Sequence, residues 1–523
     1  MAWFDEAFFY HIYPLGLLGA PECNDYGEPV PRLRALEGWL PHLEDMGVTA
    51  LYLGPVFQSG SHGYDTADYR TVDSRLGLNE DLRALVDACH ARGIRVVLDA
   101  VFNHTGRDFF AFRDLRQRRE QSPYRDWYRG VNFFGDTEYH DGFSYENWGG
   151  YNLLAKLNLQ NPAVSGYLLD TVRFWVEAFD IDGLRLDAAD VLDFGFLRQL
   201  RSLADSLKPE FWLMGEVIHG EYGRWVNGEM LHSVTDYPLH KALYSGHNDH
   251  NYFEIAHTVD RFARSGVDCR ALYSFADNHD VERIMSRLHD RRQWESVHIL
   301  LFALPGIPSV YYGSEFGVEG KKERGSDASL RPALALEELL RSENPCLERI
   351  RALGRLYRRE KALALGEYRQ LWLTTRQYAF LRGDVLVAVN NDENEAEIAL
   401  PWGEGRFRGA LRGGEIAAEG GCLRLRLPAG GGEIYLPETR GEAAYAPLRQ
   451  SLAAPEPEVP APAMAAEAVP VPGLPYEEMT VPQLQAAVLQ KLSQNGPVTE
   501  RMRREVAENV YRDSLLNWVR SFR

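Results

Sequence analysis

Short apolar runs recur along the first two thirds of the chain, and longer segments with helical periodicity lie between many of them. The runs are FFYHIYP (8–14), VTALYLGPV (48–56), IRVVLDAV (94–101), IDGLRLDAA (181–189), FWLMGEV (211–217), HSVTDYP (232–238), RALYSFADN (270–278) and IPSVYYG (307–313). The helical patterns include EDLRALVDACHARG (80–93), VSGYLLDTVRFWVEAF (164–179) and LDFGFLRQLRSLADSL (192–207). Continuous apolar strands that alternate with helices predict a parallel sheet covered on both faces.

A closed barrel is the simplest architecture for this pattern. Eight strands over roughly 350 residues fit a (β/α)₈ barrel, an α/β fold in which each parallel strand is followed by a helix. We assign residues 1–360 to this barrel. An open, doubly wound sheet is the structural alternative, because it has the same alternation of strands and helices.

Segments of a different character interrupt and follow the predicted barrel. Residues 105–159, after the third strand, are too long for a simple loop and rich in aromatic and polar residues, which indicates an inserted subdomain. Residues 361–438 contain short alternating runs, such as QYAFLRGDVLVAVNN, that are typical of an antiparallel β domain. Residues 439–475 are rich in Pro and Ala and predict a linker, and residues 476–523 predict a small helical unit.

Composition argues against several classes of partner. The chain has 57 Lys and Arg residues and 75 Asp and Glu residues, and the net charge of −18 disfavours nucleic acid or an anionic membrane. No apolar run reaches the ~18 residues that a membrane-spanning helix needs. The five cysteines include no CxxC pair, and the N-terminus has no basic segment before an apolar core. We therefore expect a reduced, cytoplasmic protein.

Acidic residues stand at the ends of four predicted strands, where the working residues of βα barrels lie. The third strand ends in DAVFNH (99–104), the fourth in Arg185-Leu-Asp187, the fifth in Glu216 and the seventh in DNHD (277–280). A single acid of this kind is usually a helix cap or the partner of an arginine. Burial of unpaired carboxylates is costly, so four acidic strand ends with two histidines and an arginine indicate a catalytic pocket.

Two facing carboxylates suit the cleavage of a glycosidic bond, because one can attack the anomeric carbon while the other protonates the leaving oxygen. Arg185 and Asp187 are two residues apart on one strand, so their side chains lie on the same side. A guanidinium there would keep Asp187 ionised, as a nucleophile requires. Glu216 has apolar neighbours in the sequence, and we expect burial and a nearby acid to raise its pKa, as suits a proton donor.

Four segments together resemble the α-amylase superfamily, glycoside hydrolase family thirteen. DAVFNH (99–104), GLRLDAAD (183–190), GEV (215–217) and FADNHD (275–280) are similar to the family's signature blocks, in the family's order. The resemblance covers roughly residues 1–438. LAKLNLQNP (154–162) partly resembles the MPKLN-type segment of the neopullulanase, cyclomaltodextrinase and maltogenic amylase group.

The resemblance implies a role for each matching residue. Asp187 would be the nucleophile, Glu216 the general acid/base, and Asp280 the third acid, which binds sugar hydroxyls beside the scissile bond. Tyr64 would be an aromatic platform under that sugar, accompanied by Asp65. The other residues implied to hold the same glucose unit are His104, Arg185 and His279, and Asp99 is the structural acid of the first block.

The chain departs from the family pattern at two places. Asn103 matches a calcium ligand of the family, but Asp190 and Val191 stand where many calcium-dependent amylases have Lys and His. We therefore expect that no cofactor is required, with calcium at Asn103 as the alternative. The neopullulanase group usually has Trp two residues after the acid/base, whereas this chain has Ile218, so the acceptor side of the site differs.

Three functions are compatible with these residues to different degrees. The first is a retaining hydrolase of α-glucosidic, mainly α-1,4, bonds in maltodextrins, starch fragments or cyclodextrins. The second is a transglycosylase or branching-type transferase, which would use the same acids and differ in how well its acceptor subsites exclude water. The third is an amylase-like protein that only binds sugar. Such a protein should lack Asp187, Glu216 or Asp280, and all three are present.

The C-terminal helical unit carries an apolar face that the catalytic pattern does not explain. Leu484, Val488, Leu489 and Leu492 recur at helical spacing. A unit of about 50 residues buries little apolar surface alone, so we expect it to dock on the barrel, form a homo-oligomer or bind a protein partner. A loosely ordered appendage is the alternative.

Overall fold

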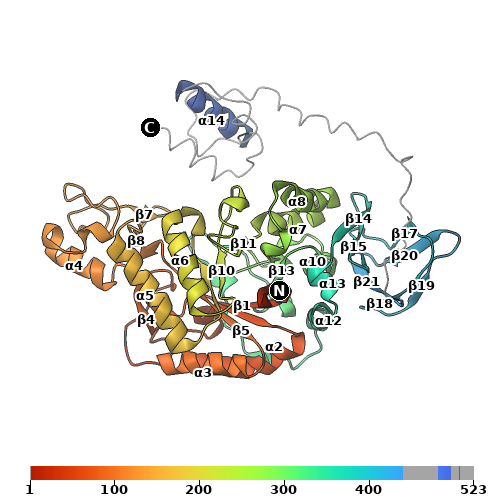
Figure 1. The fold of residues 1–523 in the computed structure, drawn as a ribbon, viewed down its shortest axis with the longest axis horizontal. Helices are drawn as coiled ribbons and strands as arrows, with labels where there is room; N and C mark the ends of the chain where they lie inside the picture. Colours follow the sequence, from red (N-terminus) through yellow and green to blue (C-terminus); the bar gives the residue numbers. More distant parts are fainter. Residues whose placement is uncertain (1, 440–480, 496–505, 507–523) are drawn as a thin grey trace. The chain divides into compact units, whose positions relative to one another are not determined.

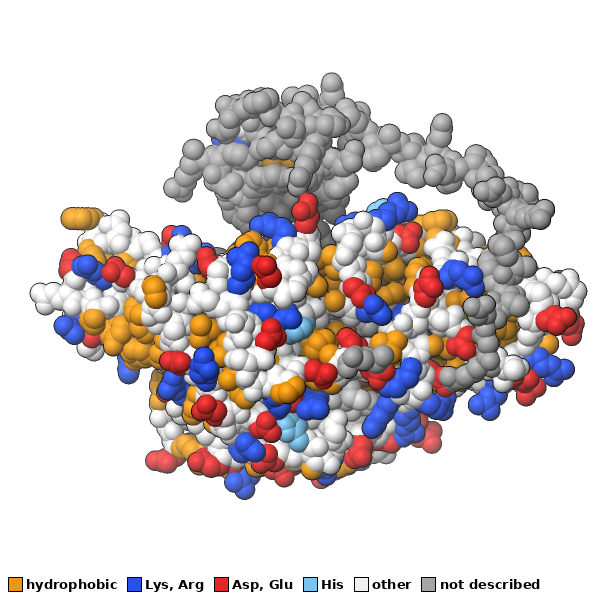
Figure 2. Space-filling view, viewed as in Figure 1, with side chains coloured by type: hydrophobic (Ala, Val, Ile, Leu, Met, Phe, Trp, Pro, Cys, Tyr) orange, Lys and Arg blue, Asp and Glu red, His pale blue; other side chains and the backbone are white. Residues whose placement is uncertain are grey.

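The computed structural model describes residues 2–439, 481–495 and 506 of the 523. The chain divides into two units, Met1–Ala446 and Pro447–Arg523, and each is considered by itself. Among the described residues, no helix is both long and apolar enough to cross a membrane. Figure 2 shows acidic and basic side chains interspersed over the described part of one face, without a large area of a single sign.

The first unit is built around a closed barrel of eight parallel strands (Figure 1). In sequence these are β1 (Phe9–Ile12), β2 (Ala50–Leu53), β5 (Arg95–Ala100), β9 (Gly183–Leu186), β10 (Trp212–Gly215), β11 (Ser233–Thr235), β12 (Leu272–Phe275) and β13 (Ile307–Tyr311). Each of the eight apolar runs contains one of these strands. The ring closes where β1 pairs with both β2 and β13, which excludes the open sheet.

Helices follow most of the barrel strands, and α3, α5 and α6 lie at the three segments predicted from apolar periodicity. Those of the barrel are α1 (Pro14–Leu17), α2 (Leu40–Met46), α3 (Asn79–His90), α5 (Pro162–Phe179), α6 (Phe194–Leu207), α7 (Tyr237–Asn248), α8 (Tyr252–Ser265), α9 (Ile284–Arg287), α10 (Trp294–Ala303), α11 (Leu336–Leu339), α12 (Pro345–Arg359) and α13 (Lys361–Leu365). Local chemistry sets their starts: the Asn161 side chain accepts from the Ala163 amide, and Pro162 opens α5. After β10 the chain has only the 3₁₀ turn Tyr222–Arg224 in place of a long helix.

Aromatic side chains fill the inside of the barrel. Phe9 stacks on Trp212 with ring centroids 4.8 Å apart and meets Tyr273 edge-on at 5.4 Å. All three are at least 97% buried, so the barrel interior is a packed core and not a channel. A second, larger core lies between strands and helices and includes Leu51, Leu98 and Trp175. Because the barrel interior and the layer between strands and helices are both packed, we expect a binding site at the ends of the strands.

The segment after β5 forms a separate small structure. Strands β6 (His104–Thr105), β7 (Asn147–Trp148) and β8 (Tyr151–Lys156) make a sheet of order β6-β8-β7, next to α4 (Phe110–Arg118). A further hairpin, β3 (Phe57–Ser59) with β4 (Thr66–Val72), precedes it after β2. The long gap at 105–159 thus holds its own sheet and helix, attached to the barrel through β6.

The chain then changes to antiparallel β structure. The strands are β14 (Tyr368–Leu373), β15 (Gln377–Arg382), β16 (Val385–Asn390), β17 (Ala396–Pro401), β18 (Arg406–Gly409), β19 (Glu415–Ala417), β20 (Cys422–Leu427) and β21 (Gly432–Pro437). They form a six-stranded sheet, with β17 and β20 paired separately. Their shared core contains Leu400, Trp402 and Phe407, which are at most 3% exposed. The first strand starts at 368, because α13 occupies the first residues of the predicted 361–438 segment.

In the second unit the structure describes α14 (Val481–Asn495). Of the four residues predicted to form its apolar face, Leu484 and Val488 are fully buried and Leu489 is partly buried, while the side chain of Leu492 is not described. The predicted linker, apart from Thr439, and most of residues 476–523 lie outside the described residues.

Candidate active site

Strand register brings the predicted residues together at one end of the barrel. Asp99 in β5 lies opposite Arg185 in β9, which in turn lies opposite Met214 in β10. The Asp187 amide donates to Ala100 O at 3.1 Å, and the Glu216 amide donates to Leu186 O at 2.9 Å. Asp187 and Glu216 therefore continue the sheet pairing just past the last strand residues, and their carboxylates are held at the same level.

Arg185 links three carboxylates. Its Nη1 lies 2.8 Å from Asp99 Oδ1 and 2.9 Å from Asp187 Oδ1, and its Nη2 lies 2.9 Å from Glu216 Oε2. The guanidinium is 3% exposed. A planar fork with fixed donors can hold several acids in one geometry, which a flexible ammonium cannot do. Asp187 and Glu216, the two carboxylates predicted to carry out the reaction, thus share one cation.

The balance of charge in this cluster favours retention of a proton. One guanidinium faces three carboxylates, and water is largely excluded. Burial raises the pKa of Asp187 well above its usual value, Arg185 opposes the rise, and Glu216 and Asp99 add to it. This differs from the expectation that Arg185 alone would keep Asp187 ionised, because the cation is divided among three acids. Without a bound substrate, the cluster is suited to holding one transferable proton.

Glu216 is fixed by contacts on both oxygens. Its Oε2 accepts from the Ala188 amide at 3.1 Å, and its Oε1 accepts from the Tyr237 hydroxyl at 3.1 Å. Asn278 donates to the same Tyr237 oxygen at 3.4 Å. Tyr237 begins α7 directly after Asp236, whose side chain caps that helix. The helix start therefore positions the hydroxyl that contacts Glu216.

A second charged group surrounds Asp280. Its Oδ2 lies 3.0 Å from His279 Nε2, and its Oδ1 lies 2.9 Å from Arg331 Nη2. Burial alone would raise the pKa of Asp280, but His279 and Arg331 outweigh it and hold the pKa well below the usual value. Arg331 also donates to the His279 carbonyl and pairs with Asp327 at 3.2 Å. His279 and Arg331 consequently favour the ionised form of Asp280.

Tyr64 joins the two charged groups. Its hydroxyl donates to Asp99 Oδ2 at 3.0 Å and contacts His279 Nε2, and its ring stacks on His279 at 5.6 Å. The Arg185 guanidinium lies 5.9 Å from the Tyr64 ring centroid. Tyr52 donates a further hydrogen bond to Asp99 at 2.8 Å. Asp99 is thus fully occupied by neighbouring donors, which accords with a structural role.

His104 and Asp65 occupy the edge of this arrangement. His104 is 1% exposed, and its Nε2 is buried with no hydrogen-bond partner in the described structure. Burial lowers the pKa of His104 to about 3, so the ring is neutral at ordinary pH. Asp65 accepts from Ser61 Oγ at 2.9 Å and so contacts the loop that carries Tyr64. An unpaired buried nitrogen calls for a partner, which a sugar hydroxyl can supply.

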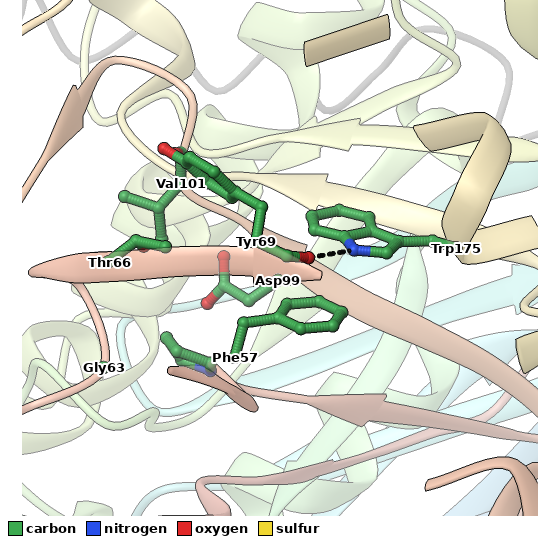
Figure 3. A pocket seen from close by; sticks show the side chains of 8 residues that line it. Phe57, Gly63, Thr66, Tyr69, Asp99, Val101 and Trp175 are labelled. Carbon is green, nitrogen blue, oxygen red and sulfur yellow. Dashed lines mark hydrogen bonds between the residues drawn. The ribbon is translucent and has the colours of Figure 1, made fainter. Parts of the chain in front are cut away.

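A small cavity lies beside Asp99 (Figure 3). It has a volume of about 10 Å³ and is lined by Phe57, Thr66, Tyr69, Val101 and Trp175 among others. The Trp175 indole donates to the Tyr69 carbonyl at 2.6 Å in its wall. Such a volume holds about one water molecule, so the cavity is no site for a sugar.

Asn103 and Val191 are the positions that the resemblance matched to calcium. The Asn103 amide nitrogen contacts His104 Nδ1 at 3.1 Å, and the Asn103 carbonyl accepts from the Leu157 amide at 2.9 Å. Val191, the other implied position, is 45% exposed. Within the described ranges, no three His, Cys, Asp or Glu side chains are grouped to hold a metal ion. Asn103 therefore supports His104 through its amide nitrogen and the segment at Leu157 through its backbone carbonyl.

Comparison with known proteins identifies the family. Residues 32–344 match the family model for the α-amylase catalytic domain. The chain belongs to the α-amylase family. It is an enzyme of the glycosidase type, and the resemblance inferred from the four signature blocks is confirmed.

Relatives within the α-amylase family extend over most of the chain. Neopullulanase 2 of Thermoactinomyces vulgaris is 34% identical over 458 residues, which cover 81% of this chain and 76% of that protein. A cyclomaltodextrinase of a Bacillus species is 31% identical over 421 residues, covering 75% and 74%. A solved structure from Thermus thermophilus superposes with a TM-score of 0.73 at 32% identity, covering 83% of this chain and 99% of that one.

Four residues of this α-amylase-family site were not predicted from the sequence. They are His11, Tyr52, Tyr237 and Arg331. His11 is a lone polar residue in the apolar run FFYHIYP, and it stacks on Tyr52 at 4.1 Å, so this signal was available. Arg331 lies 20 residues after β13 ends, in a loop with no periodic pattern, and only the folded chain brings it to Asp280.

Proposed function

We propose that this protein is a retaining hydrolase of α-glucosidic bonds, mainly α-1,4, in maltodextrins, starch fragments or cyclodextrins. The observation that carries the proposal is the Arg185 fork, which holds Asp187 and Glu216 side by side in a nearly dry pocket. Two relatives are named neopullulanase and cyclomaltodextrinase, and a third, 31% identical over 376 residues, is named maltogenic α-amylase. These names describe substrates and products of the same class.

The proposed reaction is a double displacement. Asp187 attacks the anomeric carbon as the glycosidic bond breaks, and Glu216 gives its proton to the departing oxygen. The resulting glycosyl ester is then attacked by water, whose proton returns to Glu216, and Asp187 leaves. This cycle requires Asp187 to be ionised and the proton shared within the three-acid cluster to lie on Glu216. Arg185 stays charged throughout and moves no proton.

The remaining residues would bind the sugar next to the broken bond. Asp280, held as an anion by His279 and Arg331, can accept hydrogen bonds from sugar hydroxyls. The neutral His104 offers its unpaired Nε2 to another hydroxyl. The partly exposed Tyr64 ring supplies an apolar face for the sugar. Asp65 accepts a hydrogen bond from Ser61 and so helps to fix the loop that carries Tyr64. Arg185 and Asp99 would then hold these side chains in position.

Hydrolysis and transglycosylation would use the same acids, and one experiment separates them. Incubation of the full chain with maltoheptaose should release only sugars shorter than maltoheptaose. Products longer than maltoheptaose would favour a transferase, and no product at all would contradict both.

The proposed reaction requires no cofactor. The two carboxylates supply the nucleophile and the proton. We propose further that the protein works in the cytoplasm, in line with five free cysteines and with a relative named intracellular maltogenic amylase from Bacillus subtilis, 33% identical over 311 residues.

For the C-terminal helical unit we propose a role in assembly, as a homo-oligomer contact or a contact with a protein partner. Every predicted catalytic residue precedes it in the sequence. Truncation after Glu438 should therefore preserve turnover of a short maltooligosaccharide and lower the oligomeric mass on a sizing column. Unchanged mass in the presence and absence of cell extract would contradict this role.

A further inference from the structure

Two large aromatic side chains are exposed at the tip of the β7–β8 hairpin. Trp148 is 38% exposed and Tyr151 is 64% exposed. They lie directly opposite each other in the pairing of β7 with β8. Opposite residues of an antiparallel pair project from the same face of the sheet, so the two rings form one exposed aromatic surface. Exposed aromatic surface of this kind usually marks a binding site.

The hairpin is held in a defined shape. Gly149 and Gly150 connect the strands with φ values of 63° and 87°, the pattern of a tight two-residue turn in which both positions need positive φ. Asn147 donates to Asn152 Oδ1 at 2.7 Å and accepts from the Gly150 amide at 3.0 Å. Asn152 in turn donates to Glu138 at 2.5 Å. A preformed surface loses little entropy when a ligand binds.

The same hairpin adjoins the candidate active site. Strand β8 also pairs with β6, where His104 lies opposite Lys156. The Trp148 ring lies 6.0 Å from the His104 ring, at an angle of 39°. His104 is the residue whose buried Nε2 has no hydrogen-bond partner in the described structure and is proposed to bind the sugar. One aromatic surface is therefore continuous with the proposed substrate position.

We propose that Trp148, with Tyr151 beside it, forms an additional α-glucan subsite that binds a glucose unit beyond the one contacting His104. A glucose ring presents apolar C–H faces, and an indole is a large, rigid surface for them. The occupant is a longer stretch of the same neutral glucan chain, because the aromatic surface adjoins His104, which is proposed to contact the neighbouring glucose unit. This inference rests on the proposed function, because it extends the same substrate chain.

The test compares long and short substrates. In Trp148→Ala, KM for maltohexaose should rise about tenfold with kcat within about twofold, while 4-nitrophenyl α-glucoside, which is too short to reach the hairpin, should be unaffected. Trp148→Phe should restore most of the affinity. Phe134→Ala is the matched control, because Phe134 is a fully exposed aromatic residue of the same inserted segment. An unchanged KM for maltohexaose would overturn the subsite, as would an equal loss on both substrates.

Direct binding separates this inference from the proposed function. Calorimetric titration of maltohexaose into Glu216→Gln, and into Glu216→Gln with Trp148→Ala, measures affinity without turnover. A Kd about tenfold weaker in the double variant supports the subsite even if the wild-type protein hydrolyses nothing, a result that would overturn only the hydrolase proposal. Equal Kd values, or a change in oligomeric mass without a change in Kd, would overturn the subsite. Thermal melting of each variant confirms that the chain is folded.

Discussion

Arg185 Nη2 lies 2.9 Å from Glu216 Oε2, while the other terminal nitrogen of the same guanidinium holds Asp187 at 2.9 Å. The two acids assigned to chemistry are therefore oriented by one planar group. Lysine has the same charge but lacks the planar group whose two terminal nitrogens contact the two acids. We expect Arg185→Lys to lower kcat at least about 100-fold, equivalent to ~3 kcal/mol, with near-native stability.

The matched control for this change is Arg198→Lys. Arg198 pairs with Glu229 at 3.1 Å on the surface, where an ion pair contributes little. Its activity should equal that of the wild type. Full activity in Arg185→Lys would show that charge alone, and not the fork, is required.

The two catalytic acids should differ in their response to an activated leaving group. Asp187→Asn should lose about 10³-fold or more on every substrate, because an amide cannot form the glycosyl ester. Glu216→Gln should lose a similar factor on maltoheptaose but keep much of its rate on 4-nitrophenyl α-maltoside, whose leaving group needs little protonation. Initial rates on both substrates measure the difference. Reversed behaviour of the two variants would exchange their roles, and activity on starch in either variant would remove the assignment.

Arg331 should affect the pH dependence of the reaction. His279 and Arg331 depress the pKa of Asp280, which must be ionised to accept from sugar hydroxyls. Activity is therefore lost only when pH falls through that low pKa. Removal of the cation in Arg331→Ala raises the pKa, so the acidic limb of kcat/KM should move to higher pH, with a loss of about tenfold near neutrality. Arg331→Lys should move it less, and identical limbs in the three proteins would refute the link.

Removal of divalent metal should leave the enzyme active. The two carboxylates of the proposed reaction supply the nucleophile and the proton, and Arg185 contacts all three acids of the cluster. After dialysis against EDTA, kcat on maltoheptaose and the melting temperature should change by less than experimental scatter. Loss of activity that added Ca²⁺ restores would show that Asn103 is a calcium ligand.

Local patterns predicted the barrel and the acids, because both depend on short segments. Strand β9 and its two functional residues lie within the single short run IDGLRLDAA, so periodicity and chemistry are visible together. Arg331 contacts Asp280 from a loop without a pattern, and Tyr52 lies in a predicted strand whose pattern does not show its contact with Asp99, so only folding shows both contacts. The ratio of one cation to three acids could not be predicted either. The sequence places Arg185 beside Asp187, but it does not show that Asp99 and Glu216 contact the same guanidinium.

The stereochemistry of the first product tests the central claim most directly. If Asp187 forms a glycosyl ester that water then displaces, the configuration at the anomeric carbon is inverted twice and so retained. Proton NMR during the first minutes of maltoheptaose hydrolysis should show the α anomer ahead of mutarotation. Initial appearance of the β anomer would mean a single displacement by water, and would contradict the role given to Asp187.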